Sequence, residues 1–232
     1  MRTADPDPAA VTRQSYDLIA EQYQARNTGS RPEFVAWRDA WVAALHARAA
    51  ASAASATPGA SAVPVVATGA PTVLDAGAGP GQHTAALADS GLRAVALDAS
   101  EAMAALARAR GVPVVRGDLR RLPFADGAFD GVWASASLLH VPRDEVPATL
   151  AEWRRVAAPG GLLALSTASG GTDGWEDPPY DTGGERPPRR WFTYHDEEPL
   201  RGLLDAAGWA VEDVTTFASH RLWLRVLATA RG

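Results

Sequence analysis

Residues 73–81 read Val-Leu-Asp-Ala-Gly-Ala-Gly-Pro-Gly, a short apolar run that ends in an acid and enters a glycine-rich turn. This stretch predicts a strand that turns into a helix at the carboxyl edge of an open α/β sheet, where nucleotide-like ligands bind. Its glycines permit positive φ angles and close approach of a ligand to the backbone, and they are Gly77, Gly79 and Gly81. A dinucleotide fingerprint would need its third glycine at position 82, which holds glutamine. Asp75, two residues before the first glycine, would repel a pyrophosphate and suits a ligand with an ammonium group.

Downstream of this turn, short apolar runs alternate with stretches of helical pattern, which predicts a parallel sheet with crossover helices. The expected strands cover residues 72–75, 93–98, 112–116, 129–134 and 162–167, and the expected helices cover 81–89, 100–110 and 144–157. The segment 168–190 is rich in Gly, Pro, Asp and Trp, and we expect no regular element there. A helix near 197–207, with Gly208 as its stop, precedes two strands at 209–217 and 222–229 that can pair as an antiparallel hairpin.

Upstream of the turn, the chain looks helical over 15–23 and again after a break at 29–32. In the second helix one stripe carries three large rings and a leucine at helical spacing, namely Phe34, Trp37, Trp41 and Leu45. This stripe either packs on the core alone or also roofs a pocket for an apolar substrate. From Ala47 to Ala70 the sequence is almost entirely Ala, Ser, Thr, Pro, Val and Gly, which is typical of a helix tail that runs into a linker.

Composition removes several kinds of chemistry. The 232 residues hold no cysteine, and every one of the 22 basic residues is arginine, so thiolate, Schiff-base lysine and Walker-lysine sites are excluded. The net charge of −5 gives no general attraction to nucleic acid, and we expect no nucleic-acid partner. Without a signal-like N-terminus or an apolar run of membrane-spanning length, we expect a cytoplasmic protein with no membrane association.

Three further features fall where a ligand bound at the glycine turn should extend, and one of them is the expected fourth strand at 129–133 with the residues 134–140 that follow it. Asp98 ends the second strand, where a carboxylate can accept both hydroxyls of a ribose. Asp118 and Leu119 follow the third strand, where they can meet an adenine whose faces Leu119 and Met103 cover. Singly, an Asp at a strand end is more often a helix cap or turn residue, but here the acids recur in order along the sheet.

The segments VLDAGAGPGQHT, ALDAS, GDLRRLPFADGAFDGVWASASLLHV and LAEWRRVAAPGGLLALST occur in the order found in class I S-adenosylmethionine-dependent methyltransferases. The chain resembles that family over about residues 71–168, in particular its small-molecule, ubiquinone/menaquinone-type group. The resemblance implies a Rossmann-like, doubly wound, seven-stranded sheet, mostly parallel with an antiparallel C-terminal strand, and an N-terminal helical cap. This sequence departs from the family pattern in the Ala-rich stretch at 49–70 and in the segment 169–192.

The resemblance also implies a cofactor pocket for S-adenosylmethionine. The glycine turn would meet the methionine moiety, and Asp75 its ammonium group, through water or directly. Asp98 would meet the ribose, and Asp118 with Leu119 the adenine. Helical residues would cover the methionyl end, and these are Tyr16, Tyr23 and, as the weakest, Arg26. Ser135 and His140 would lie beside the sulfonium. We expect a cap over 1–48, a linker over 49–71 and a core over 72–232 whose segment 169–195 closes over the site.

Methyl transfer needs alignment and desolvation first, and a general base only when the acceptor holds its proton. His140 is one candidate base, with Tyr194 and His195 as a second cluster, although each can equally be a structural residue. We expect no metal. The leading hypothesis is methyl transfer to oxygen or nitrogen of a small, partly apolar or aromatic molecule. A tRNA or protein methyltransferase, and a cyclase or binding module that keeps the cofactor without methyl transfer, remain open, as does the oligomeric state.

Overall fold

The structure is a computed structural model that describes residues 7–27, 29, 32–55, 69–180 and 188–232. Two N-terminal helices, α1 (Pro8–Arg26) and α2 (Pro32–Ser55), precede the sheet. The first half of the core then runs β1 (Thr72–Ala76), α3 (Gln82–Asp89), β2 (Arg93–Asp98), α4 (Glu101–Ala109), β3 (Val114–Arg116) and β4 (Phe129–Ser135). The second half runs η1 (Leu138–His140), α5 (Val146–Val156), β5 (Ala157–Ser169), β6 (Gly174–Glu176), β7 (Arg190–Phe192), α6 (Glu197–Ala206), β8 (Trp209–Ala218) and β9 (Leu222–Ala230).

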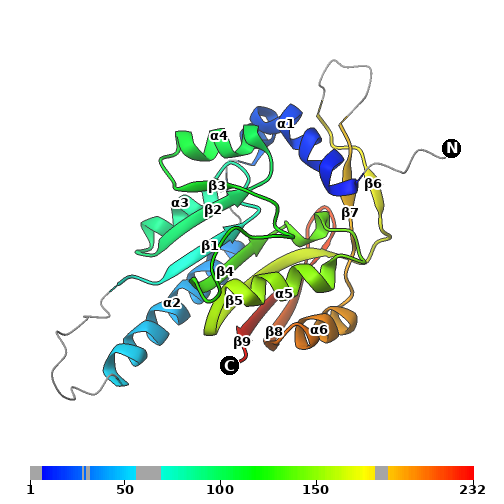
Figure 1. Cartoon of the computed structure of the whole chain (residues 1–232). Coiled ribbons are helices and arrows are strands. Elements are labelled where there is room, and N and C mark those ends of the chain that lie inside the picture. The colour runs from blue at the N-terminus through cyan, green and yellow to red at the C-terminus, as the bar shows by residue number, and fades with distance from the viewer. Residues whose placement is uncertain (1–6, 28, 30–31, 56–68, 181–187) are drawn as a thin grey trace.

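The central sheet has seven strands in the order β3-β2-β1-β4-β5-β9-β8 (Figure 1). Its strands from β3 to β5 are parallel, and β9 is antiparallel to both β5 and β8. The order reverses between β1 and β4, and ligands of open α/β sheets bind at such a switch point. The predicted doubly wound fold and its C-terminal hairpin are therefore confirmed.

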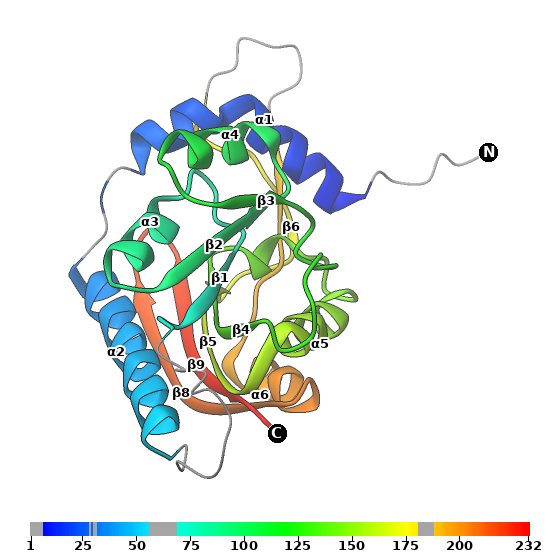
Figure 2. The same cartoon turned by 60° about the vertical axis from the view of Figure 1, so that its left-hand side comes forward.

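Helices cover both faces of the sheet, and each face has its own core. On one face α5 and α6 bury an apolar cluster that includes Trp153 and Trp209, while α2 covers the opposite face (Figure 2). There Trp41 and Leu45 of α2 are buried against Trp133 of β4. The predicted stripe of α2 thus packs on the core.

Two predicted boundaries need correction. The Ala-rich stretch after position 48 continues as helix to Ser55, because alanine has the highest helix propensity; the rest of the expected linker, 56–68, lies outside the described residues. The prediction that 168–190 forms no regular element was wrong, since β5 extends to Ser169 and β6 pairs with β7. Trp175 and Trp191 lie directly opposite each other in that pair and meet edge to face at 5.5 Å, so aromatic packing stabilises a short hairpin-like unit.

Over the described ranges, no helix is both long and apolar enough to cross a bilayer.

Candidate functional site

A cavity of about 850 Å³ opens at the carboxyl ends of the parallel strands. Its floor comes from the loops after β1, β2, β3 and β4, and its cover comes from α1 and β7, which lie side by side above the sheet edge (Figures 1 and 2). This volume lies in the upper part of the range for small-molecule sites, as a site for both a cofactor and an acceptor requires.

The glycine turn forms one wall of this cavity, and its backbone is fixed by the neighbouring strand. The N–H groups of Gly77 and Ala78 donate to the carbonyl of Leu97 at 2.8 and 3.0 Å. Gly77 has a φ of +80°, and a Cβ placed there would stand 2.4 Å from Cβ of Ser137. A side chain at position 77 is therefore excluded by both conformation and space, which confirms the predicted need for glycine.

Asp98 lies at the end of β2 and lines the cavity. One carboxylate oxygen accepts the N–H of Gly79 and the other accepts the N–H of Ser100, both at 2.8 Å. Each oxygen has a second lone pair, so two acceptor positions stay available for a ligand. Desolvation by burial raises the pKa of Asp98 to about 6, against the lowering effect of the two backbone N–H groups.

Asp75 lies differently from the sequence expectation. Its side chain is buried at 1% exposure, accepts the hydroxyl of Thr84 at 2.7 Å, and is not among the residues that line the cavity. Burial raises its pKa to about 7. The carboxylate thus joins β1 to α3 behind the glycine turn. In this position it does not contact the ammonium group of a ligand directly.

The residues expected around an adenine all line the cavity, namely Met103, Asp118 and Leu119. Met103 is buried at the first turn of α4. The Asp118 carboxylate forms an ion pair with the guanidinium of Arg120 at 2.7 Å, and the same guanidinium also pairs with Asp7 and Glu145. Asp118 is therefore part of an ion-pair network that also fixes the start of α1.

Helix α1 is tied down at both sides of the cavity. On one side Asp17 accepts the hydroxyl of Ser100 at 2.6 Å, next to Asp98. On the other side Ser15 exchanges two hydrogen bonds with the backbone of Arg189, and Thr12 accepts the N–H of Trp191 at 2.9 Å. The two segments expected to cover the site, α1 and the region before residue 195, are thus bonded to each other; residues 181–187 of that region lie outside the described residues.

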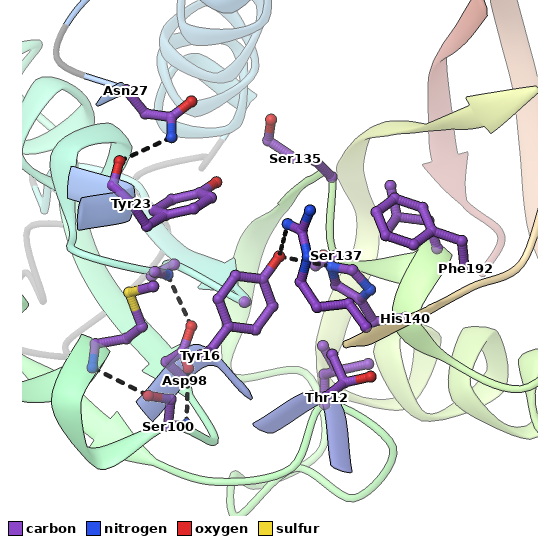
Figure 3. A pocket seen from close by; sticks show the side chains of 18 of the residues that line it. Thr12, Tyr16, Tyr23, Asn27, Asp98, Ser100, Ser135, Ser137, His140 and Phe192 are labelled. Atoms are coloured by element: carbon purple, nitrogen blue, oxygen red, sulfur yellow. Dashed lines mark hydrogen bonds between the residues drawn. The ribbon is translucent and has the colours of Figure 1, made fainter. Parts of the chain in front are cut away.

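Tyr16 and His140 meet over the cavity although 124 residues separate them (Figure 3). His140 donates from Nδ1 to the carbonyl of Trp191 at 2.7 Å, because a carbonyl can only accept. Nε2 of the neutral ring then accepts the Tyr16 hydroxyl at 2.8 Å, and Arg190 donates to the same hydroxyl oxygen at 3.1 Å. Burial lowers the pKa of His140 to about 3, so its imidazole is neutral near pH 7.

The remaining expected site residues divide into two groups. Tyr23 and Ser135 line the cavity; Tyr23 packs edge to face on Tyr16 at 5.6 Å, and Ser135 lies 3.3 Å from the hydroxyl of Ser166. Tyr194 and His195 are not among the lining residues. The Tyr194 hydroxyl donates to Glu176 at 2.5 Å, and His195 is buried at 2% exposure, because both follow β7 into the core. Arg26 is not among the lining residues either, but it donates to the carbonyl of Pro179, which lines the cavity.

The far end of the cavity extends toward β8 and β9. The alternative that the stripe of α2 roofs a pocket is met there by Phe34, but sequence reasoning missed the other residues of this end. This end is lined by aromatic and cationic side chains, namely Phe34, His83, Phe217, Trp223, Arg221 and Arg225. His83 packs on Phe34 at 4.9 Å, and its burial lowers its pKa to about 4. The available signal was Arg225, a single charge inside the otherwise apolar strand LWLRVLATA.

Within the described part of the chain, no three His, Asp or Glu side chains are grouped closely enough to hold a metal ion.

Residues 74–165, which include β1, β2, β4 and most of β5, match the family model described as a methyltransferase domain. The chain therefore carries a class I S-adenosylmethionine-dependent methyltransferase domain. Among the curated relatives of this segment are demethylmenaquinone methyltransferases. The demethylmenaquinone methyltransferase of Mycolicibacterium vanbaalenii is 48% identical over 93 residues, which are 40% of this chain and 40% of that protein. The match thus spans less than half the length of the curated relative.

Solved structures share the methyltransferase fold over the whole chain. One is the 1,6-didemethyltoxoflavin-N1-methyltransferase of Burkholderia thailandensis, solved with bound 1,6-didemethyltoxoflavin and S-adenosylhomocysteine. Its TM-score is 0.69 at 22% identity, and the alignment covers 100% of this chain and 94% of the other chain. The [4+2]-cyclase SpnF has a TM-score of 0.64 at 20% identity, with coverage of 99% and 98%. At these identities the likeness establishes the fold alone.

The cavity of this methyltransferase domain fits S-adenosylmethionine, the cofactor of the family. Asp98 offers two free acceptor positions for ribose hydroxyls, and the turn at Gly77 leaves room only for bare backbone beside Ser137. The Ser137 hydroxyl lines the cavity, is buried and has no hydrogen-bond partner among the described residues. A buried polar atom without a partner is costly, and a polar ligand in the cavity would supply one.

Proposed function

We propose that this chain transfers a methyl group from S-adenosylmethionine to oxygen or nitrogen of a small, planar, partly apolar molecule. The observation that carries the proposal is the continuity of the cavity. One end has the glycine turn and Asp98, the other end is lined by aromatic side chains, and Ser135 lies between them. The names of a demethylmenaquinone methyltransferase and of a 1,6-didemethyltoxoflavin-N1-methyltransferase among the similar proteins support a flat ring system as acceptor.

When bound, the cofactor supplies a methyl group on a sulfonium, and the chain's own residues align the partners and exclude water. Asp98 accepts from the ribose and fixes the cofactor along β2. Helix α1 and strand β7 close the top of the cavity through the bonds of Ser15 and Thr12, which keeps water from the reacting centre. Alignment and desolvation are the contributions that in-line displacement needs most.

His140 serves in this proposal as a positioning residue. Its Nε2 lone pair is engaged by the Tyr16 hydroxyl, and its depressed pKa of about 3 makes it a weak proton acceptor near neutral pH. The imidazole of His140 fixes the hydroxyl of Tyr16 in place, because the imidazole itself is anchored through Nδ1 to the backbone of β7. A general base is required only if the acceptor enters with its proton, and an acceptor that is already ionised needs none.

The test is turnover by the full chain. The protein is incubated with S-adenosylmethionine and a panel of naphthoquinols, phenols, aromatic amines and bulk tRNA, and S-adenosylhomocysteine and methylated products are measured by mass spectrometry. We expect methylation of at least one small aromatic and none of tRNA. Tight cofactor binding without product from any small molecule would refute the proposal and favour a binding module or a cyclase. The [4+2]-cyclase SpnF is an example of a cyclase with this fold. Methylated tRNA would refute it in favour of the nucleic-acid class.

A further inference from the structure

Arg225 lies in a row of polar side chains that crosses three strands at the far end of the cavity. In the sheet register Ser135 of β4 is opposite Ser166 of β5, and Ser166 is opposite Arg225 of β9. Residues directly opposite each other on adjacent strands project from the same face, and the two serine hydroxyls lie 3.3 Å apart. All three residues line the cavity, so the row leads from the expected sulfonium end to a buried cation.

The guanidinium of Arg225 is buried and forms no ion pair with a carboxylate of the described residues, although the charge of Glu33, an exposed residue of α2, acts on it. Arg225 is 8% exposed, and one of its terminal nitrogens donates to the backbone carbonyl of Glu33 at 3.2 Å. Its Nε has no hydrogen-bond partner among the described residues, and none of their carboxylates forms an ion pair with it. A buried charge costs several kcal/mol unless it is paired, so this arrangement is expected to be completed by another group.

Aromatic rings hold the guanidinium from its sides. Its central carbon lies 3.9 Å from the ring centre of Phe217, 5.5 Å from that of Trp37 and 5.7 Å from that of Phe34. Such cation–π contacts stabilise the charge and fix the plane of the group, but they supply no hydrogen-bond acceptor. Five N–H donors in a rigid fork match a carboxylate, and stacked rings around the fork match a flat apolar ligand.

We propose that Arg225 binds an acidic group, best matched by a carboxylate, on a planar aromatic methyl acceptor. This inference rests on the proposed function, because it assigns the far end of the cavity to the acceptor. An acceptor of that kind carries a negative charge near neutral pH. The row Ser135, Ser166 and Arg225 then determines which acceptors enter, since an uncharged analogue would leave the buried cation unpaired.

Four other arginines line the cavity. Arg13 is paired with Asp17 at 3.4 Å, and Arg120 is paired with Asp118 at 2.7 Å. Arg221 is paired with Glu176 at 2.7 Å and donates to the Tyr194 hydroxyl at 2.8 Å. Arg190 donates to the Tyr16 hydroxyl and belongs to β7, above the cofactor end. The Nε of Arg190, like that of Arg225, is buried without a partner among the described residues. Arg225 is the least exposed of the five arginines, and it lies among the aromatic rings of the cavity.

The first test compares 2-naphthoate with 2-naphthamide, which have the same rings and differ in charge. Each is titrated by calorimetry into wild-type protein saturated with S-adenosylhomocysteine at pH 7. We expect naphthoate to bind at least tenfold more tightly, the scale of hydrogen bonds to a charged group. Equal affinities, a preference for the amide, or no binding of naphthoate would overturn the inference. Failure of S-adenosylhomocysteine itself to bind would instead refute the proposed function, so the two failures are distinguishable.

The second test assigns the preference to Arg225. Arg225→Met should lose the preference while the Kd for S-adenosylhomocysteine stays within about twofold, and Arg225→Lys should keep part of it because the charge remains. Arg108→Met is the matched control, since Arg108 is an exposed arginine of α4 that pairs with Glu101 outside the cavity. Loss of the preference in Arg190→Met, with retention in Arg225→Met, would overturn the assignment. If Arg225→Met fails to fold, the wild-type comparison and Arg225→Lys decide.

Discussion

The affinity for the cofactor product should depend on pH through Asp98, and the structure gives the size of the effect. In the free protein burial raises the pKa of Asp98 to about 6. Ribose hydroxyls donate to the two remaining acceptor positions, so the ligand favours the ionised carboxylate and lowers its pKa in the complex. Binding therefore releases a proton, and affinity rises with pH until the free carboxylate is fully ionised.

For a group with a pKa of about 6, the ionised fraction is about one tenth at pH 5 and about nine tenths at pH 7. Linkage then predicts roughly tenfold tighter binding of S-adenosylhomocysteine at pH 7 than at pH 5, or about 1.4 kcal/mol. In Asp98→Asn the amide NH₂ must face the N–H of either Gly79 or Ser100, two donors without an acceptor between them. This variant should bind at least tenfold more weakly at pH 7 and show almost no pH dependence.

The assay is calorimetric titration of S-adenosylhomocysteine at pH 5, 6 and 7 and constant ionic strength. Asp75→Asn is the matched control, because Asp75 has a raised pKa of about 7 but lies behind the glycine turn. It should keep the tenfold ratio between pH 7 and pH 5. A flat profile in Asp75→Asn together with a wild-type profile in Asp98→Asn would refute the assignment of the ribose to Asp98, as would wild-type affinity for Asp98→Asn.

Three further outcomes test the covering elements and the glycine turn. Gly77→Ala should lower stability by about 3 kcal/mol or more and abolish product binding, because its positive φ and the contact with Ser137 both oppose a Cβ. Gly79→Ala, with a φ of +54° but no atom within 4 Å of a Cβ, should cost about 1–2 kcal/mol; thermal melts and titration compare the two variants. Amide hydrogen exchange in α1 and β7 should slow when S-adenosylhomocysteine binds, and unchanged exchange in both would contradict their role as a cover. His140→Ala and Tyr16→Phe should each lower kcat by about tenfold with similar cofactor affinity, the loss of one hydrogen bond; a 100-fold loss confined to His140→Ala would restore its role as base.

Much of the cofactor end could be predicted because its information is local. A strand, a glycine turn and the next helix are contiguous, so the spacing of Gly77 and the acid at the end of β2 fixes what faces the switch point. Asp75 shows the limit of that reasoning. It was expected to reach the ligand, but the structure orients its carboxylate toward Thr84 of α3, because the side chain of a strand residue faces whichever helix packs on that side.

The hairpin-like pair β6 and β7 was missed for a related reason. Each strand has three residues, and neither shows an apolar alternation long enough to predict a strand. What makes them strands is the contact between Trp175 and Trp191, which are separated by the Gly- and Pro-rich stretch between them. Pairing across such a separation depends on the packing of α1 against β7, and the composition of the segment does not reveal it.

The sequence alone determined the class of the fold, the place of the glycine turn and the place of Asp98 at the end of β2, because helix and strand periodicities and strand-end positions are properties of neighbouring residues. Only the tertiary structure decided what Tyr16, His140 and Arg225 do. Tyr16 bonds a histidine 124 residues away, and Arg225 is buried among rings from the preceding strand β8 and from α2, which lies near the other end of the chain. Such contacts exist only after the chain has closed long loops and buried its apolar faces, and burial is what leaves His140 neutral and Arg225 without a carboxylate.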